Sequence, residues 1–229
     1  MERRIQSRWS DACRFARNWI CDLVDRSGCR RVAYRHPETA DRAKRIDDHC
    51  PNQVCETISM GRHGTPGPVR GDEKLYRILV APHQVDLSTE AILITAISHT
   101  EAMGMSVLRH SASTTEFSQI ARELLAGDPK RSVFGVAEID CNMIRDLKSK
   151  TNEARRQKGD RHFVVLDTDL PKLPNHVDVF NTFPRKQIDP KDPTNKAIWR
   201  KERARLFDLA KAQVTKCLSE EYLNHMNHL

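Results

Sequence analysis

The sequence contains no long apolar run, no paired two-residue cysteine motif and few aromatic residues, which make up 6% of the chain. Its longest uncharged apolar stretch, residues 91–97, is far shorter than the roughly 20 residues of a membrane-spanning helix. The charged first residues, Met1-Glu2-Arg3-Arg4, are unlike the apolar centre of a secretion signal. Seven scattered cysteines, an odd number, are typical of reduced thiols. We therefore expect a soluble, cytoplasmic protein.

A zinc site has only weak support. Cys50, Cys55 and His63 lie close together in a segment rich in glycine and proline, where a tetrahedral ion would compensate for a small core. The two-residue cysteine spacing of a zinc knuckle is absent, so reduced cysteines and a solvated histidine are the favoured interpretation.

The length of 229 residues allows one large or two small domains. Apolar residues recur at helical spacing from Ile5 to Val24 and predict an amphipathic N-terminal helix that carries Trp9 and Trp19. Seven of the 21 residues in 51–71 are Gly or Pro, which predicts a linker. The expected organisation is a helical segment over 1–50, a loop or linker over 51–72, and a domain with strands and helices over 73–229.

The second part of the chain predicts an α+β fold, or alternatively an α/β fold, with a mixed sheet flanked by helices. Ser113 and Glu116 form a capping box before a helix that ends at Gly127. A helix is also favoured over 91–97, and a basic final helix from Thr194 or Asn195 to about Leu218. The predicted strands are residues 75–81, 105–109, 133–140, 162–166 and 177–180.

Positive charge collects at the two ends of the chain. Residues 1–50 carry 12 Lys and Arg against 8 Asp and Glu, residues 151–229 carry 15 against 11, and residues 51–150 carry 11 against 12. This uneven distribution of charge favours a polyanionic partner. A cluster of Lys and Arg side chains can contact phosphates without a precise spacing between them. The expected nucleic-acid contacts are Arg155, Arg156, Lys158, Arg161, Lys196, Arg200, Lys201 and Arg203. The alternative is a solvated surface that serves solubility.

Acidic residues follow two of the predicted strands. Asp140 ends one strand, and Asp167 and Asp169 follow another. If the strands are neighbours, these carboxylates, with Asp178, could hold Mg²⁺ or Mn²⁺. Asp167 and Asp169, assisted by His176, would then form the catalytic centre of a metal-dependent phosphodiesterase or nuclease. Capping and turn formation are the plainer explanation for these acids.

No nucleophilic constellation is visible in the sequence. Ser106, Ser111 and Ser113 lie near His110, but none is flanked by the glycines of a nucleophile elbow. The favoured hypothesis is a protein that binds a nucleic-acid backbone electrostatically, and the metal-dependent enzyme is its rival. A third possibility is an adaptor that docks a partner protein through the Trp9 and Trp19 face of the N-terminal helix.

Overall fold

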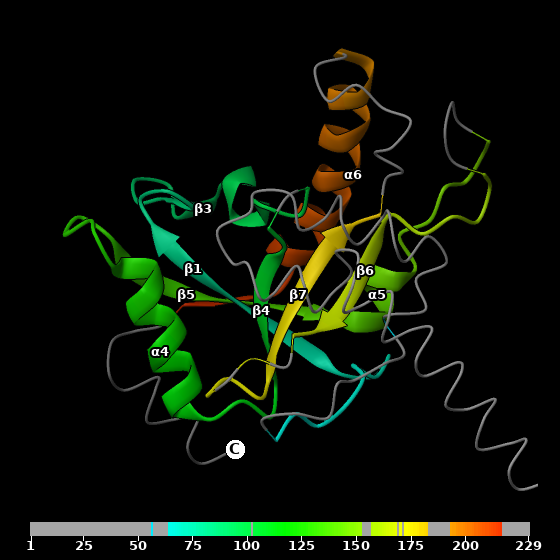
Figure 1. The fold of residues 1–229 in the computed structure, drawn as a ribbon. Coiled ribbons are helices and arrows are strands. Elements are labelled where there is room, and N and C mark those ends of the chain that lie inside the picture. Colours follow the sequence, from blue (N-terminus) through cyan, green and yellow to red (C-terminus); the bar gives the residue numbers. More distant parts are fainter. Residues whose placement is uncertain are drawn as a thin grey trace, which may run out of the picture.

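The computed structural model describes residue 56 and residues 64–101, 103–152, 157–168, 170, 172–182 and 193–216. Within these residues a six-stranded sheet has the order β6-β7-β4-β1-β5-β8, and each strand pairing is antiparallel (Figure 1). The α+β prediction is confirmed at this level, with an antiparallel sheet in place of the expected mixed one. The strands are β1 (Lys74–Ala81), β4 (Met105–Arg109), β5 (Ser132–Asp140), β6 (Phe163–Asp167), β7 (His176–Asn181) and β8 (Val214–Lys216).

Helices cover both faces of this sheet because side chains alternate along each strand. On one face, called the α6 face, Leu75, Val107 and Val177 pack with residues of α5 (Cys141–Arg145), η2 (Ile94–Ile97) and α6 (Pro193–Lys211). On the other, called the α4 face, Ile78 and Leu108 pack under α4 (Thr114–Leu125). The described residues therefore form three layers (Figure 1).

The capping box predicted for α4 is confirmed. The side chain of Ser113 accepts from the backbone nitrogen of Glu116, and the Glu116 carboxylate accepts from that of Ser113. Gly127 follows the helix with a φ of 82°, the left-handed conformation that glycine adopts most readily. Phe117 is buried against the sheet, with its ring centroid 6.1 Å from that of Tyr76. The capping residues, the terminal glycine and the packing of Phe117 therefore all support the helix predicted from the sequence.

The helix expected over 91–97 is not present. Instead, β2 (Val85–Asp86) pairs with β3 (Ala91–Ile92), and one 3-10 turn, η2, follows. The intervening residues form a turn, in which Asp86 Oδ1 accepts from the Ser88 nitrogen at 2.9 Å and Glu90 has a φ of 55°. The Asp, Ser and Thr side chains that cap the start of a helix also stabilise turns. For this reason the residues before 91 predicted a helix where the chain forms a turn.

The final helix is shorter than expected. It begins at Pro193 and ends at Lys211, and the chain then forms β8, which pairs with Gly135–Ala137 of β5. Val214 and Thr215 are β-branched and suit a strand, and the open edge of β5 supplies the hydrogen-bond partners. None of the described helices is long and apolar enough to cross a membrane.

Part of the predicted linker packs on the sheet domain. Val69 is buried in the core of the α6 face, and its carbonyl accepts from Arg145 Nη2 at 2.7 Å. Glu56 is buried and accepts from Arg145 Nε at 2.9 Å and from the Val165 nitrogen at 3.0 Å. The segment 1–50 lies outside the described residues, and the proposed domain boundaries stay a prediction.

Candidate functional site

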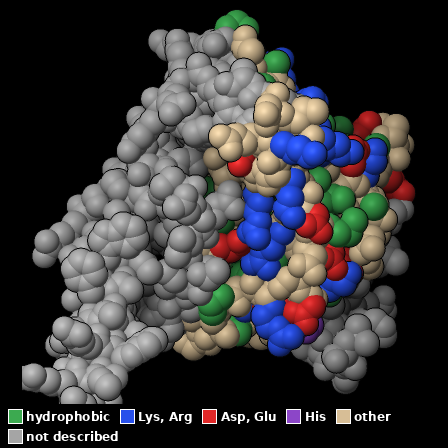
Figure 2. Space-filling view, turned by 90° about the vertical axis from the view of Figure 1, so that its right-hand side faces the viewer, with side chains coloured by type: hydrophobic (Ala, Val, Ile, Leu, Met, Phe, Trp, Pro, Cys, Tyr) green, Lys and Arg blue, Asp and Glu red, His purple; other side chains and the backbone are tan. Residues whose placement is uncertain are grey.

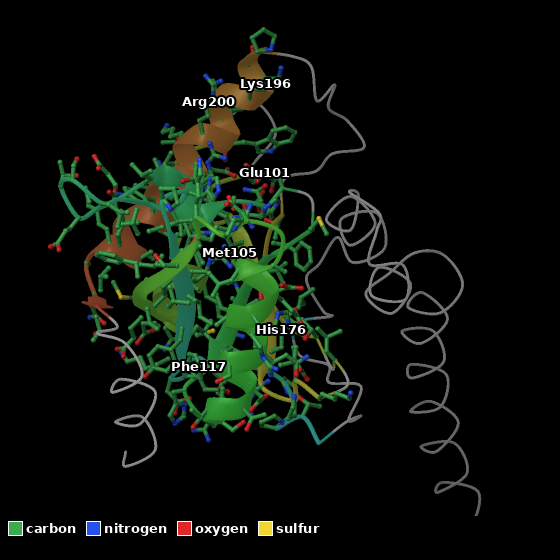
Figure 3. The ribbon with its side chains drawn as sticks, turned by 90° about the vertical axis from the view of Figure 1, so that its left-hand side faces the viewer. Glu101, Met105, Phe117, His176, Lys196 and Arg200 are labelled. Atoms are coloured by element: carbon green, nitrogen blue, oxygen red, sulfur yellow. The ribbon has the colours of Figure 1, made fainter. Side chains whose placement is uncertain are left out.

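The first half of α6 presents exposed cations from the set of predicted nucleic-acid contacts. Lys196 and Arg200 are four residues apart, so their side chains share a helix face, and both are exposed (Figure 3). Within the described residues, no carboxylate lies within 4.0 Å of either side chain. The first turn of α6 also contains no acidic residue. Because a helix N-terminus carries partial positive charge, the charges of the helix and its side chains add here.

Cations closer to the sheet are neutralised. Arg203 Nη1 lies 3.4 Å from a Glu101 carboxylate oxygen, and Arg161 forms an ion pair with buried Glu56. Arg145 shares the Glu56 carboxylate, so Glu56 and the two arginines form one partly buried network. Arg161 and Arg203 therefore form ion pairs within the fold, whereas Lys196 and Arg200 are exposed.

The residues directly before β6, which follow the predicted contacts Lys158 and Arg161, adjoin α6. Arg205 Nη1 on α6 lies 3.4 Å from His162 Nδ1, directly before β6. Lys158 is exposed, and its backbone nitrogen donates to Asn152 Oδ1 at 2.8 Å. Figure 2 shows Lys and Arg side chains gathered in a band on this side of the molecule, with Asp and Glu side chains beside it. Lys201 is exposed on α6, and Arg155 and Arg156 lie outside the described residues.

The predicted acidic centre does not assemble from its described members. The condition for that centre, that the strands ending in Asp140 and Asp167 are neighbours, is not met, because β7, β4 and β1 separate β5 from β6. Asp167 pairs with Val177 and so faces the α6 side, while Asp178, the next residue of β7, faces the α4 side. His176 shares the face of Asp178, so the sheet separates it from Asp167.

Asp140 has a local structural role. Its carboxylate caps α5 by accepting from the backbone nitrogens of Asn142, at 2.9 Å, and Met143, at 3.3 Å. In the part of the chain that the structure describes, no group of three or more His, Cys, Asp or Glu side chains is placed to hold a metal ion. Asp169 lies outside this part, and its pairing with Asp167 stays a prediction.

His176 is held by two hydroxyl groups instead. Its Nε2 lies 2.5 Å from Ser106 Oγ on β4, and its Nδ1 lies 2.8 Å from Thr168 Oγ1. Sequence reasoning considered Ser106 only beside His110, which is nearby in the chain. The true partner is 70 residues away and is brought close by the pairing of β4 with β7. No local motif marks this contact.

Comparison with family models, with curated proteins and with solved structures finds no match to the chain. Function is therefore inferred from the geometry of this chain. The weakly supported zinc site at Cys50, Cys55 and His63 and the alternative of protein docking through Trp9 and Trp19 fall on residues outside the described part.

Proposed function

We propose that this protein binds the phosphate backbone of a nucleic acid, with the first half of α6 as the central contact. The observation that carries the proposal is the pair Lys196 and Arg200, exposed on one helix face with no described carboxylate within 4.0 Å. Like charges four residues apart destabilise a helix. Their repulsion is relieved when a polyanion supplies the missing negative charge.

Several features support the backbone rather than the bases as the ligand. Trp199 is the only aromatic residue between Lys196 and Arg205, and its ring is partly buried. Readout of single-stranded bases relies on exposed aromatic platforms, whereas phosphate contacts need only exposed cations. A duplex or a structured RNA is the expected ligand. Lys158, Arg155 and Arg156 would extend the contact surface from the neighbouring loop.

The test is fluorescence anisotropy with a labelled 20-base-pair DNA duplex and the matching RNA duplex over a range of salt concentrations. We expect log K to fall linearly with log salt for the native chain. In Lys196→Ala/Arg200→Ala the slope on DNA falls by up to about 1.8, roughly 0.9 for each lost phosphate contact. Charge reversal at Arg155 and Arg156 tests the loop in the same assay.

Lys211→Ala is the matched control on the same helix. Lys211 is exposed, but it already pairs with Asp208 at 3.1 Å and lies at the other end of α6. Its removal is expected to leave both affinity and slope nearly unchanged. An unchanged slope in the double variant, or an equal loss in Lys211→Ala, would count against α6 as the contact surface.

A further inference from the structure

The contact between Ser106 and His176 is built into the sheet. Ser106 pairs with Asp178 across β4 and β7, and Leu108 pairs with His176, so all four side chains lie on the α4 face. The Ser106 hydroxyl and His176 Nε2 are 2.5 Å apart. His176 is buried, and both partners sit on regular strands, which fixes their separation more firmly than a loop would.

Thr168 determines which nitrogen of His176 carries the proton. Its Oγ1 lies 3.0 Å from the His176 carbonyl oxygen, which can only accept a hydrogen bond. We assign the single hydroxyl proton of Thr168 to that carbonyl, which makes Thr168 Oγ1 the acceptor from Nδ1–H at 2.8 Å. The proton is thereby placed on Nδ1, and the lone pair of Nε2 faces the hydroxyl proton of Ser106. A general base that activates a serine has this arrangement.

Ser106 also lines a cavity of about 360 Å³. That volume lies within the range that small-molecule sites occupy. Arg77 and His99 line the same cavity. A hydroxyl paired with an imidazole is thus within reach of a bound molecule.

Arg77 gives this cavity a positive charge. Its guanidinium is held by hydrogen bonds from Nε to the Ala96 carbonyl, at 3.2 Å, and from Nη1 to the Ser106 carbonyl, at 2.8 Å. Burial lowers the pKa of Arg77 to about 10, with Asp178 opposing the shift, so the side chain stays protonated at neutral pH. No described carboxylate lies within 4.0 Å of the guanidinium. The Asp178 carboxylate already acts on this guanidinium, and an anionic group in the cavity would be a second partner for it.

We propose that Ser106 and His176 form a nucleophile and general base that cleave a small carboxylic ester bearing a negative charge, with Arg77 recognising that charge. Ser106 Oγ forms a bond to the ester carbonyl carbon while its proton passes to His176 Nε2. The bond from that carbon to the alcohol oxygen breaks, and the alcohol leaves with the proton from Nε2. Water then repeats the sequence and releases the acid, which restores the serine. Thr168 acts as a positioning residue.

The first experiment is labelling of the full chain with diisopropyl fluorophosphate, followed by peptide mapping with mass spectrometry. The Ser106 oxygen bonds to phosphorus, fluoride leaves, and the proton passes to His176. We expect an adduct on Ser106, its loss in Ser106→Ala, and a labelling rate at least about 100-fold lower in His176→Gln. Ser111→Ala is the matched control, since Ser111 Oγ donates to Asn175 Oδ1 at 2.7 Å, and its labelling should equal that of the native chain.

The role of Thr168 is tested by a pair of variants. Thr168→Val removes the acceptor for Nδ1–H and is expected to slow labelling about tenfold, while Thr168→Ser keeps the hydroxyl and restores the native rate. Melting temperatures show whether each variant is folded. No adduct on Ser106 in the folded native chain, or equal labelling rates in native protein and folded His176→Gln, would overturn the proposal.

The substrate charge is tested with two 4-nitrophenyl esters, the neutral acetate and the anionic monosuccinate. We expect a higher kcat/KM for the monosuccinate, and a preference at least about tenfold weaker in Arg77→Gln. If that variant does not fold, the substrate charge is tested on the native chain. We then expect succinate, but not neutral succinamide, to protect Ser106 from labelling by diisopropyl fluorophosphate. Equal kcat/KM for both esters, or no protection by succinate, would refute the anionic substrate class.

Discussion

The carboxylate of Glu116 on α4 accepts a hydrogen bond from the backbone nitrogen of Asn175, at 2.9 Å, and another from its side-chain Nδ2, at 3.0 Å. The two residues are 59 positions apart in the chain. Glu116 also accepts from the Ser113 nitrogen at 2.8 Å, so one buried carboxylate both caps α4 and ties it to the segment before β7. It thereby fixes the helix that covers the face on which Ser106 and His176 meet.

Glu116→Ala is expected to destabilise the protein by about 2 to 4 kcal/mol, because it leaves the Ser113 nitrogen and both nitrogens of buried Asn175 without their charged acceptor. The measurement is urea unfolding followed by circular dichroism. Glu123→Ala on the same helix is the control. Glu123 is exposed and accepts from Gln119 at 3.3 Å, with no other partner among the described residues, so a change within about 0.5 kcal/mol is expected. Equal losses in the two variants would show that Glu116 has no special role.

The same carboxylate makes stability depend on pH. Burial by itself raises the pKa of Glu116, but hydrogen bonds from Ser113 and Asn175 outweigh it and hold the pKa below the ordinary 4.5. A depressed folded-state pKa contributes stability that is present above the unfolded value and is lost as pH falls through the folded value. Urea unfolding from pH 7 to pH 3 should show a difference between native and Glu116→Gln that shrinks toward the acid end. A difference that is constant with pH would contradict this linkage.

The second half of α6 anchors the helix whose first half carries the proposed contacts. Leu206 is 0% exposed in the core of the α6 face. Leu206→Ala should cost about 2 to 5 kcal/mol, from lost burial and the cavity it leaves. Leu87→Ala makes the same chemical change at a residue that is 60% exposed and should cost less than about 0.5 kcal/mol. Thermal unfolding of the two variants measures the contrast, and similar melting temperatures would place Leu206 outside the core.

Elements with local signals were predictable from the sequence. The helix after Ser113 combines a capping box, a regular apolar stripe and a terminal glycine, and all three hold in the structure. Elements that depend on a distant partner were not. The end of α6 is decided by the free edge of β5, and the turn before β3 by side chains that fit two local structures.

The candidate sites likewise include features that the sequence shows and contacts that only the fold creates. The cations of α6 were visible as a run of Lys and Arg, but the ion pair that neutralises Arg203 was not, because Glu101 is 102 positions away from Arg203 in the chain. His176 was singled out beside Asp167, which lies on the other face of the sheet. Its contact with Ser106 follows from the order of the strands in the sheet and from their register. The pattern of residues along one strand shows neither the order nor the register.

The backbone at Gly104 lies close to side chains on the face that carries His176. Its φ is 93°, and a Cβ at this position would lie 2.7 Å from Phe180 Cζ and 2.9 Å from the Asp178 Cβ. Gly104→Ala is therefore expected to incur two costs, about 1 to 2 kcal/mol for the left-handed backbone and about 1 to 3 kcal/mol for displacing its neighbours. Gly159→Ala measures the backbone cost alone, because the φ of Gly159 is 96° but nothing lies within 4 Å of its added Cβ. Urea unfolding should show a clearly larger loss for Gly104→Ala. Equal losses would mean that Phe180 and Asp178 move aside without cost, and that this part of the α4 face is loosely packed.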